Sequence, residues 1–123
     1  MVMPGWKKPK PEKVEVPKVR TTRFRVVNLY LKDADTEYSW QVPRGLTRFN
    51  LQVRDNVEIR VATREGLVAG SNEPYFTLKP GCVWSEGQLE VTEDQLIYFA
   101  SSLAGNTVEI LLMIEEEMST TPD

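Results

Sequence analysis

Apolar and polar residues alternate along most of this chain with a period of two. The alternation begins after residue 20 and is most regular in residues 37–42, 47–53 and 107–114, where every second side chain is apolar. This period is typical of β-strands that bury one face, because successive side chains point to opposite sides of a sheet. No segment repeats apolar residues at helical spacing, so the pattern predicts an all-β protein.

Turn-forming residues divide the alternating region into seven to nine short strands. The candidate strands are residues 21–31, 37–42, 47–53, 57–63, 75–78, 82–85, 88–91, 96–101 and 107–114. Short strands with frequent turn signals are typical of an antiparallel sandwich. We therefore expect a two-sheet antiparallel sandwich, jelly-roll-like, with an immunoglobulin-like sandwich or a closed barrel as the alternatives.

Three local patterns refine this outline. In the first strand, Phe24 and Val26 share one phase while Val27 and Leu29 share the other, which predicts a bulge near Val26. The second and third regular strands after it, residues 47–53 and 57–63, are separated by a short polar connection and form the best hairpin candidate. Further on, a Lys-Pro-Gly sequence predicts a type II turn with Gly81 at positive φ.

Composition divides the chain into three parts. Residues 1–20 contain four prolines and six cationic side chains against two acidic ones, a net of +4. We expect them to form an extended N-terminal arm, with a disordered tail as the alternative. Residues 21–115 would form the sandwich domain and residues 116–123 an acidic tail. The last fifteen residues carry five acids and no cation, so the two ends of the chain have opposite charge. This arrangement favours head-to-tail contacts between copies, with two solvated tails as the alternative.

Length and charge exclude several classes of function. With 123 residues the chain has the size of about one domain, and its net charge of −3 does not suit a dedicated nucleic-acid-binding protein. It contains no histidine, which removes the commonest general base and a common zinc ligand. No apolar run approaches the ~20 residues of a membrane span, and the polar N-terminus does not resemble a signal peptide. We expect a non-enzymatic protein without cofactor or metal, made in the cytoplasm.

The remaining candidates for chemistry have simpler structural explanations. Cys82 is the single cysteine and lies in an alternating apolar pattern, so we expect a small buried hydrophobic residue. Acidic turns at residues 33–35 and 92–94 could hold calcium, yet turn formation explains both. The outward glutamates and arginines of the regular strands are typical of a solvated sheet face of mixed charge.

The last two strands are apolar on both phases. In the last strand, Leu111 and Met113 lie opposite the regular apolar phase, and in the strand before it Ile97 and Phe99 lie opposite two further apolar residues. If the two strands pair, these four side chains form an apolar patch on the outer face of the sandwich. Such a patch requires cover. The N-terminal arm or the long loop could supply it, but another subunit is favoured.

The N-terminal arm contains candidate contact residues of its own. Trp6 stands in a polar segment, and its indole suits an anchor on a neighbouring subunit. Lys7 and Lys8 beside it suit acidic groups on that neighbour. The candidate subunit-interface residues are therefore Trp6, Lys7, Lys8, Ile97, Phe99, Leu111 and Met113.

Residues 47–114 also contain a recognisable succession of motifs. A pair of alternating strands is followed by YFTLKPG and then by LIYFASSLAGNTVEILLMI. In these motifs the chain resembles small β-sandwich structural proteins of tailed bacteriophage virions. The final strand departs from that group, whose last strand usually contains tryptophan, and the arm has no counterpart in it. The matching residues are Tyr75, Phe76, Leu78, Gly81, Leu96, Tyr98, Ser101, Ala104, Gly105, Val108, Glu109 and Ile110.

The resemblance implies a virion structural protein that acts by subunit contacts, as a capsid decoration or cement protein. It implies a homo-oligomer, for which we expect a trimer, bound to the major capsid protein or other virion proteins. A neck, tail or baseplate component is the alternative within the virion. The alternative from another class is a carbohydrate-binding sandwich, in which Tyr38, Trp40, Tyr75 or Trp84 would stack on sugars.

Overall fold

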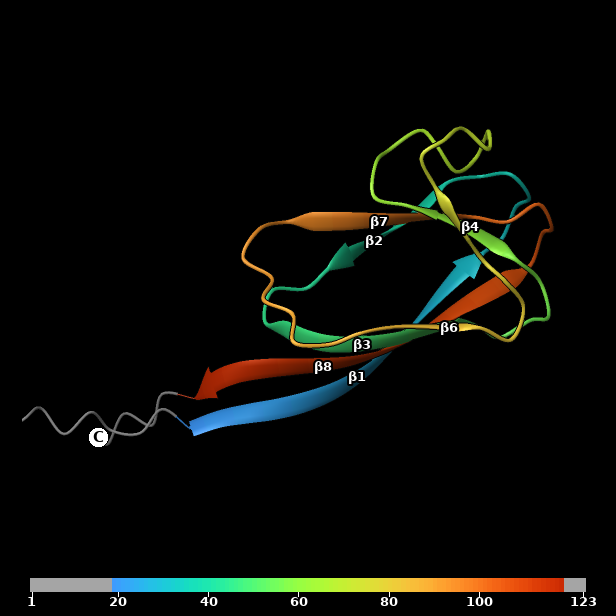
Figure 1. The fold of residues 1–123 in the computed structure, drawn as a ribbon. Coiled ribbons are helices and arrows are strands. Elements are labelled where there is room, and N and C mark those ends of the chain that lie inside the picture. Colours follow the sequence, from blue (N-terminus) through green and yellow to red (C-terminus); the bar gives the residue numbers. More distant parts are fainter. Residues whose placement is uncertain (1–18, 119–123) are drawn as a thin grey trace, which may run out of the picture.

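The protein is an antiparallel β-sandwich (Figure 1). The computed structural model describes residues 19–118, and within that range every regular element is a strand. The candidate arm, apart from its last two residues, and residues 119–123 of the tail lie outside the described residues. The strands are β1 (Val19–Leu31), β2 (Tyr38–Val42), β3 (Leu46–Val53), β4 (Ile59–Ala62), β5 (Phe76–Leu78), β6 (Val83–Glu86), β7 (Gln95–Ala100) and β8 (Asn106–Met118).

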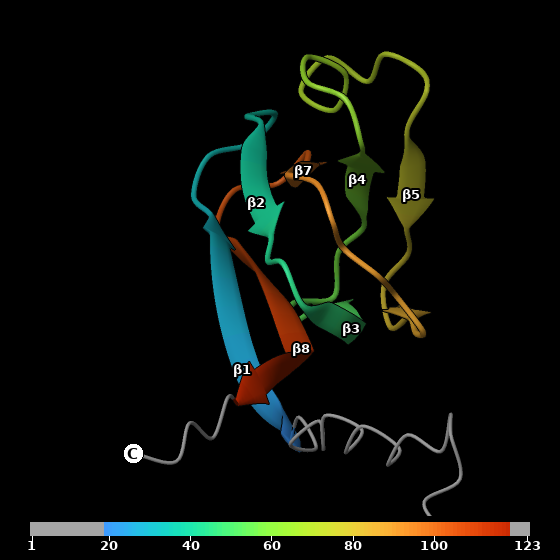
Figure 2. The same ribbon diagram turned by 90° about the vertical axis from the view of Figure 1, so that its left-hand side faces the viewer.

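The eight strands form two four-stranded sheets, which face each other in Figures 1 and 2. One sheet has the order β1-β8-β3-β6 and the other has the order β2-β7-β4-β5. The first strand pairs with the last, the second with the seventh, the third with the sixth and the fourth with the fifth, all antiparallel. This nested pairing is a long hairpin rolled into two sheets, which is a jelly roll. The predicted fold class is thereby confirmed.

Alternation determines which face of most strands is buried. In β8, Val108, Ile110, Leu112 and Ile114 point inward and are at most 5% exposed. The intervening residues of β8 lie on the outer face, as expected from the period of two. Together with the inward residues of β2, β3 and β4, these side chains form the main core between the sheets.

Two predictions about the strands are wrong: the bulge in the first strand and the hairpin of residues 47–63. The pairing of β1 with β8 continues from Val19 to Leu31 without a shift in register, so there is no bulge near Val26. The apolar residues on both phases of β1 instead reflect an apolar outer face. Strands β3 and β4 lie in opposite sheets rather than in one hairpin, because their connection crosses from one sheet to the other.

Residues 88–91 are the third departure, since they form a connection and not a strand. One backbone bond, from Leu89 N to Thr47 O at 2.9 Å, holds this connection against the start of β3. The apolar side chains Leu89 and Val91 pack against the main core. Their alternation therefore reflects a loop that closes one end of the sandwich, not a ladder of strand pairs.

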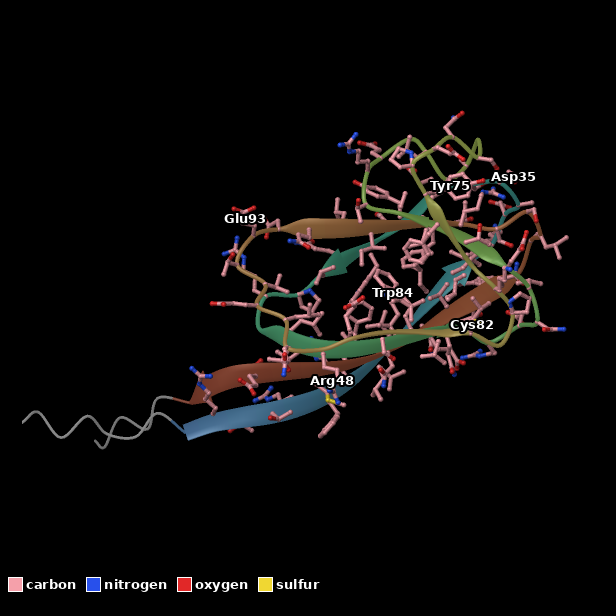
Figure 3. The ribbon with its side chains drawn as sticks, viewed as in Figure 1. Asp35, Arg48, Tyr75, Cys82, Trp84 and Glu93 are labelled. Carbon is pink, nitrogen blue, oxygen red and sulfur yellow. The ribbon has the colours of Figure 1, made fainter. Side chains whose placement is uncertain are left out.

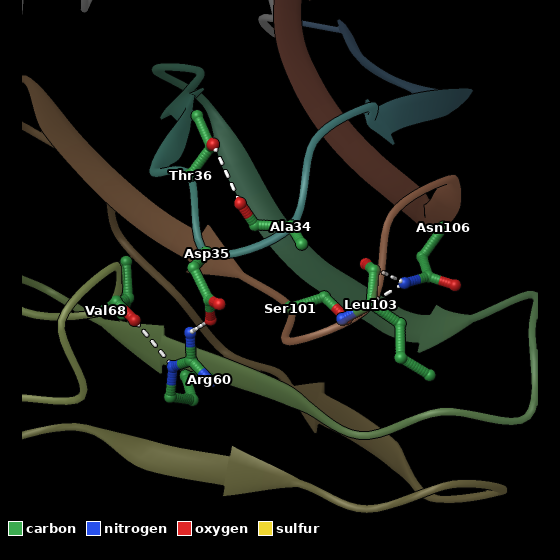
Figure 4. Close-up of polar contacts among 8 residues, drawn as sticks. All are labelled: Ala34, Asp35, Thr36, Arg60, Val68, Ser101, Leu103 and Asn106. Atoms are coloured by element: carbon green, nitrogen blue, oxygen red, sulfur yellow. Dashed lines mark hydrogen bonds and ion pairs between the residues drawn. The ribbon is translucent and has the colours of Figure 1, made fainter.

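A polar cluster holds the loops at the other end of the sandwich (Figure 4). The buried Ser101 Oγ accepts bonds from Asn106 Nδ2 at 2.9 Å and from Leu103 N at 3.1 Å. Arg60, whose side chain is 13% exposed, pairs with Asp35 at 2.8 Å. These bonds satisfy polar groups that would otherwise be costly to bury, and they fix the loops that precede β2 and β8.

Two glycines adopt positive φ where the chain turns sharply. Gly81 has φ of 76°, as predicted for its turn. Gly45 has φ of 85°, and its carbonyl accepts a 2.9 Å bond from Glu115 N. A Cβ at Gly45 would lie 2.9 Å from the Glu115 carbonyl oxygen. This close approach couples the β2–β3 turn to β8, and only glycine adopts it without strain.

Candidate functional site

The structure separates the four strand residues that were expected to share one outer patch. Strands β7 and β8 lie in opposite sheets and do not pair. Ile97 is 7% exposed and Phe99 is fully buried, so both belong to the core. Their placement on an outer face is wrong, because β7 points its other phase, Leu96 and Tyr98, away from the main core. Leu96 is 41% exposed.

Leu111 and Met113, in contrast, do lie on the outer face of their sheet, where each is half-buried. In the register of β1 and β8, Leu111 faces Val26 and Met113 faces Phe24. Phe24 is 66% and Val26 68% exposed. We call these four residues the outer strip. Phe24 and Val26 were missed as site residues because their phase was interpreted as a bulge, although an apolar second phase was the signal.

The rest of this face is polar and internally bonded. Asn50 Oδ1 accepts a 2.7 Å bond from Ser85 Oγ. Glu109 accepts bonds from Gln52 Nε2 and Arg54 Nε, both at 3.3 Å. A shallow hollow of about 420 Å³ lies where the outer strip meets these groups. An apolar centre flanked by satisfied polar groups is the usual anatomy of a protein interface.

Strand β1 is also the edge of its sheet. On its other side it pairs with no strand of residues 19–118. Beyond the pairing of Leu46 with Ile114, β1 and β8 continue as a two-stranded ribbon toward both termini (Figure 1). In this ribbon Arg20 lies 3.6 Å from Glu115 and Arg23 lies 3.3 Å from Glu116. Part of the opposite charge at the two ends is thus paired within the chain.

A second surface feature is a cleft of about 720 Å³ beside the connection between β6 and β7. Its floor is apolar, and its aromatic residues include Phe49 and Trp84, whose ring centroids lie 4.9 Å apart in an edge-to-face contact. Figure 3 shows Trp84 between the sheets and Glu93 on the connection that closes this end. The further lining residues are Gln41, Val42, Thr63, Glu86, Leu89, Val91, Asp94, Gln95, Leu96, Ile97 and Tyr98.

The rim of the cleft is acidic. Glu86 accepts a 3.0 Å bond from Trp84 Nε1, and Asp94 pairs with Arg44 at 3.2 Å. Glu90 and Glu93 lie on the adjoining connection and do not line the cleft. Among residues 19–118 they form no ion pair. The cleft therefore combines an apolar floor with acidic lining residues that already have partners, and unpaired acids lie on the connection beside it. This combination suits an apolar group that carries cations.

The acidic residues and the cysteine of the described range are dispersed. Within residues 19–118, no group of three or more Cys, Asp or Glu side chains is placed to hold a metal ion. Cys82 is exposed immediately before β6, so the expectation of a buried cysteine is wrong. It follows Gly81 in the turn and precedes the first paired residue of the strand, where the alternation no longer determines burial. In the same part of the chain no helix is long and apolar enough to cross a membrane.

The aromatic residues expected for sugar stacking point mainly inward. Trp40 is 7% exposed, and Tyr38, Tyr75 and Trp84 are half-buried and pack against core clusters. A sugar-binding platform needs an accessible ring face. These positions do not favour the carbohydrate-binding alternative.

Comparisons with known proteins identify no family. No family model and no curated protein matches the chain. Among solved structures, the solution NMR structure of a de novo designed double-stranded β-helix aligns with a TM-score of 0.40 and 20% identity, covering 76% of this chain and 99% of that one. A similarity this low carries no functional argument.

Residues 19–118 form an eight-stranded jelly-roll sandwich with two candidate interaction surfaces, the outer strip and the acidic cleft. The arm residues Trp6, Lys7 and Lys8 lie outside the described residues, so the structure places none of them.

Proposed function

We propose that this protein is a non-enzymatic structural subunit of a virion, which acts by subunit contacts as a capsid decoration or cement protein. The outer strip carries the proposal. Phe24 and Val26 are about two-thirds exposed beside Leu111 and Met113. Exposed apolar patches of this kind mark interaction sites on soluble proteins.

The size of the face suits a contact between subunits. Four strands at ~4.8 Å spacing and eight residues at ~3.3 Å each make a face of roughly 19 by 26 Å, before the relief of side chains is counted. A standard interface buries ~800 Å² on each partner. The outer face is thus large enough to supply most of one such interface, with the outer strip as its apolar centre.

The virion assignment has two supports. The jelly roll is a common architecture of viral capsid proteins, although it also occurs in lectins and cupins. The YFTLKPG and SSLAGNTVEI motifs resemble those of phage structural proteins. A decoration protein gains from repeated weak contacts, because symmetry multiplies them into a strong attachment. A neck, tail or baseplate subunit would use the same face and stays the alternative within the virion.

Self-association tests the role of the outer strip. Sedimentation velocity of the full chain should show an oligomer, and Phe24→Asp should weaken association at least tenfold, because it buries an unpaired carboxylate at the contact. Leu103→Asp is the matched control, since Leu103 is 57% exposed in a loop and should not change association. A monomeric wild-type chain, or unchanged association of Phe24→Asp, would count against the proposal.

Binding to particles tests the virion role. Purified protein should co-sediment with phage heads assembled without it, and Phe24→Asp should bind less. Binding to purified tails but not to heads would favour the neck or tail alternative. Binding to neither would remove the virion assignment.

A further inference from the structure

We propose that the acidic cleft receives the N-terminal segment of a second copy of this chain, with Trp6 on the apolar floor and Lys7 and Lys8 against the acidic connection beside it. This inference rests on the proposed function, since it names a second contact within the same assembly. It concerns a different surface from the outer strip, so each contact can be tested separately.

The floor of the cleft suits an indole. Its volume of about 720 Å³ lies in the range of natural binding pockets. Phe49 and Trp84 supply aromatic rings, and Leu89 and Val91 supply aliphatic walls from the connection before β7. Buried aromatic rings prefer edge-to-face contacts, and an incoming indole can extend the existing pair of rings.

Charge complementarity identifies the occupant. Residues 80–106 contain four acids, Glu86, Glu90, Glu93 and Asp94, and no lysine or arginine, a net of −4. Residues 1–18 contain five lysines and two glutamates, a net of +3. Two of the lysines directly follow Trp6, the single aromatic residue of that segment. An indole with adjacent ammonium groups therefore matches an apolar floor with an acidic rim.

Nearby arginines compensate only part of the rim. Arg44 is paired with Asp94. The Arg48 Nε would lie 3.0 Å from a Cβ placed on Gly87, so this guanidinium covers the start of the connection. Glu90 and Glu93 are exposed on the connection beside the cleft and do not line it, and they are left to meet Lys7 and Lys8. Contacts between such exposed charges are individually weak and sensitive to salt, so Trp6 supplies most of the binding.

Reach and direction favour the segment of a second copy. The twelve residues between Trp6 and Val19 span at most ~40 Å when extended. Strand β1 starts at the outer end of the ribbon, which projects beyond the sandwich (Figure 1). A return to the cleft of the same chain would require a reversal, which a proline-rich segment resists. A segment-to-cleft contact is heterologous, and such contacts close into rings when the rotation allows, in keeping with the expected trimer.

Complementation between two full-length variants tests the proposal. Trp6→Ala removes the anchor and keeps the cleft. Glu90→Lys with Glu93→Lys, the rim variant, reverses the unpaired charges beside the rim and keeps the anchor. Each variant alone should associate at least tenfold more weakly than the wild type in sedimentation velocity. An equimolar mixture should recover a heterodimer, because one intact segment can dock in one intact cleft. Glu58→Lys with Glu65→Lys is the matched charge reversal, placed on exposed residues outside the rim, and should associate like the wild type.

Each outcome decides the proposal. Wild-type association of Trp6→Ala overturns it, and if Phe24→Asp still weakens association, the proposed function stands without it. Loss in both single variants with no recovery in the mixture shows that the segment and the cleft do not meet across copies, and it overturns the proposal. If Leu89→Asp stays folded by circular dichroism, it should behave like the rim variant, and wild-type association of this variant removes the cleft from the contact.

Discussion

Replacing Phe99 and Phe24 by alanine, one at a time, separates the two kinds of apolar side chain in this protein. Phe99 is fully buried and Phe24 is 66% exposed. Truncation of a core phenylalanine typically costs about 3–5 kcal/mol of unfolding free energy. For Phe24, about a third of a ~200 Å² side chain is covered, which at ~25 cal/mol per Å² corresponds to about 1.7 kcal/mol. We therefore expect Phe99→Ala to lower the unfolding free energy about twice as much as Phe24→Ala, or more.

Urea unfolding at two protein concentrations measures this difference. With a slope of about 1–3 kcal/mol per molar urea, Phe99→Ala should lower the midpoint by roughly 2 M and Phe24→Ala by less than half as much when dilute. At high protein concentration the urea midpoint of Phe24→Ala should fall further below that of the wild type, because association stabilises only the wild type. Equal midpoints for the two variants would refute the burial argument. If the difference in urea midpoint between the wild type and Phe24→Ala does not depend on protein concentration, the role of Phe24 in association is refuted.

Two further predictions concern the turns. Gly45→Ala should lower the unfolding free energy at least twice as much as Gly66→Ala, which should cost about 1 kcal/mol. Both glycines have positive φ, but only at Gly45 would a Cβ approach backbone within 4 Å; equal urea midpoints would contradict the close approach. Cys82 should react with a thiol reagent as fast in the native protein as in urea, because it is exposed, and a protected thiol would place it in the core.

Alternation predicts the fold best where one phase is polar. In β2 and β3 the apolar phase is unambiguous and points inward as expected, for example at Trp40 and Leu51. In β7 both phases are apolar, so the period of two does not tell which one faces the core. The choice depends on the sheet that the strand joins. Phe99 was therefore misplaced, while Leu111 was not.

Local sequence patterns do not predict the order of the strands in the sheets. Nothing in residues 47–63 distinguishes a hairpin from a connection that crosses between sheets, since both require a short polar segment. Predicting the outer strip also required knowing which strands pair. Leu111 was found from its own strand, whereas Phe24 became recognisable only through its pairing partner Met113 across the β1–β8 ladder.

The pairing of β1 with β8 also affects how the chain can fold during synthesis. Leu31 pairs with Asn106, so this pair can form only after Asn106 has been synthesised. At ~5–20 residues per second, the ribosome needs about 4–15 s to synthesise the chain between them. Until then β1 has neither its partner strand nor its core, and both of its apolar phases face water. Its arginines are the residues that discourage wrong pairing in that interval. The first strand made is therefore the last to be completed, and chaperone binding to nascent chains should be strongest before β8 emerges.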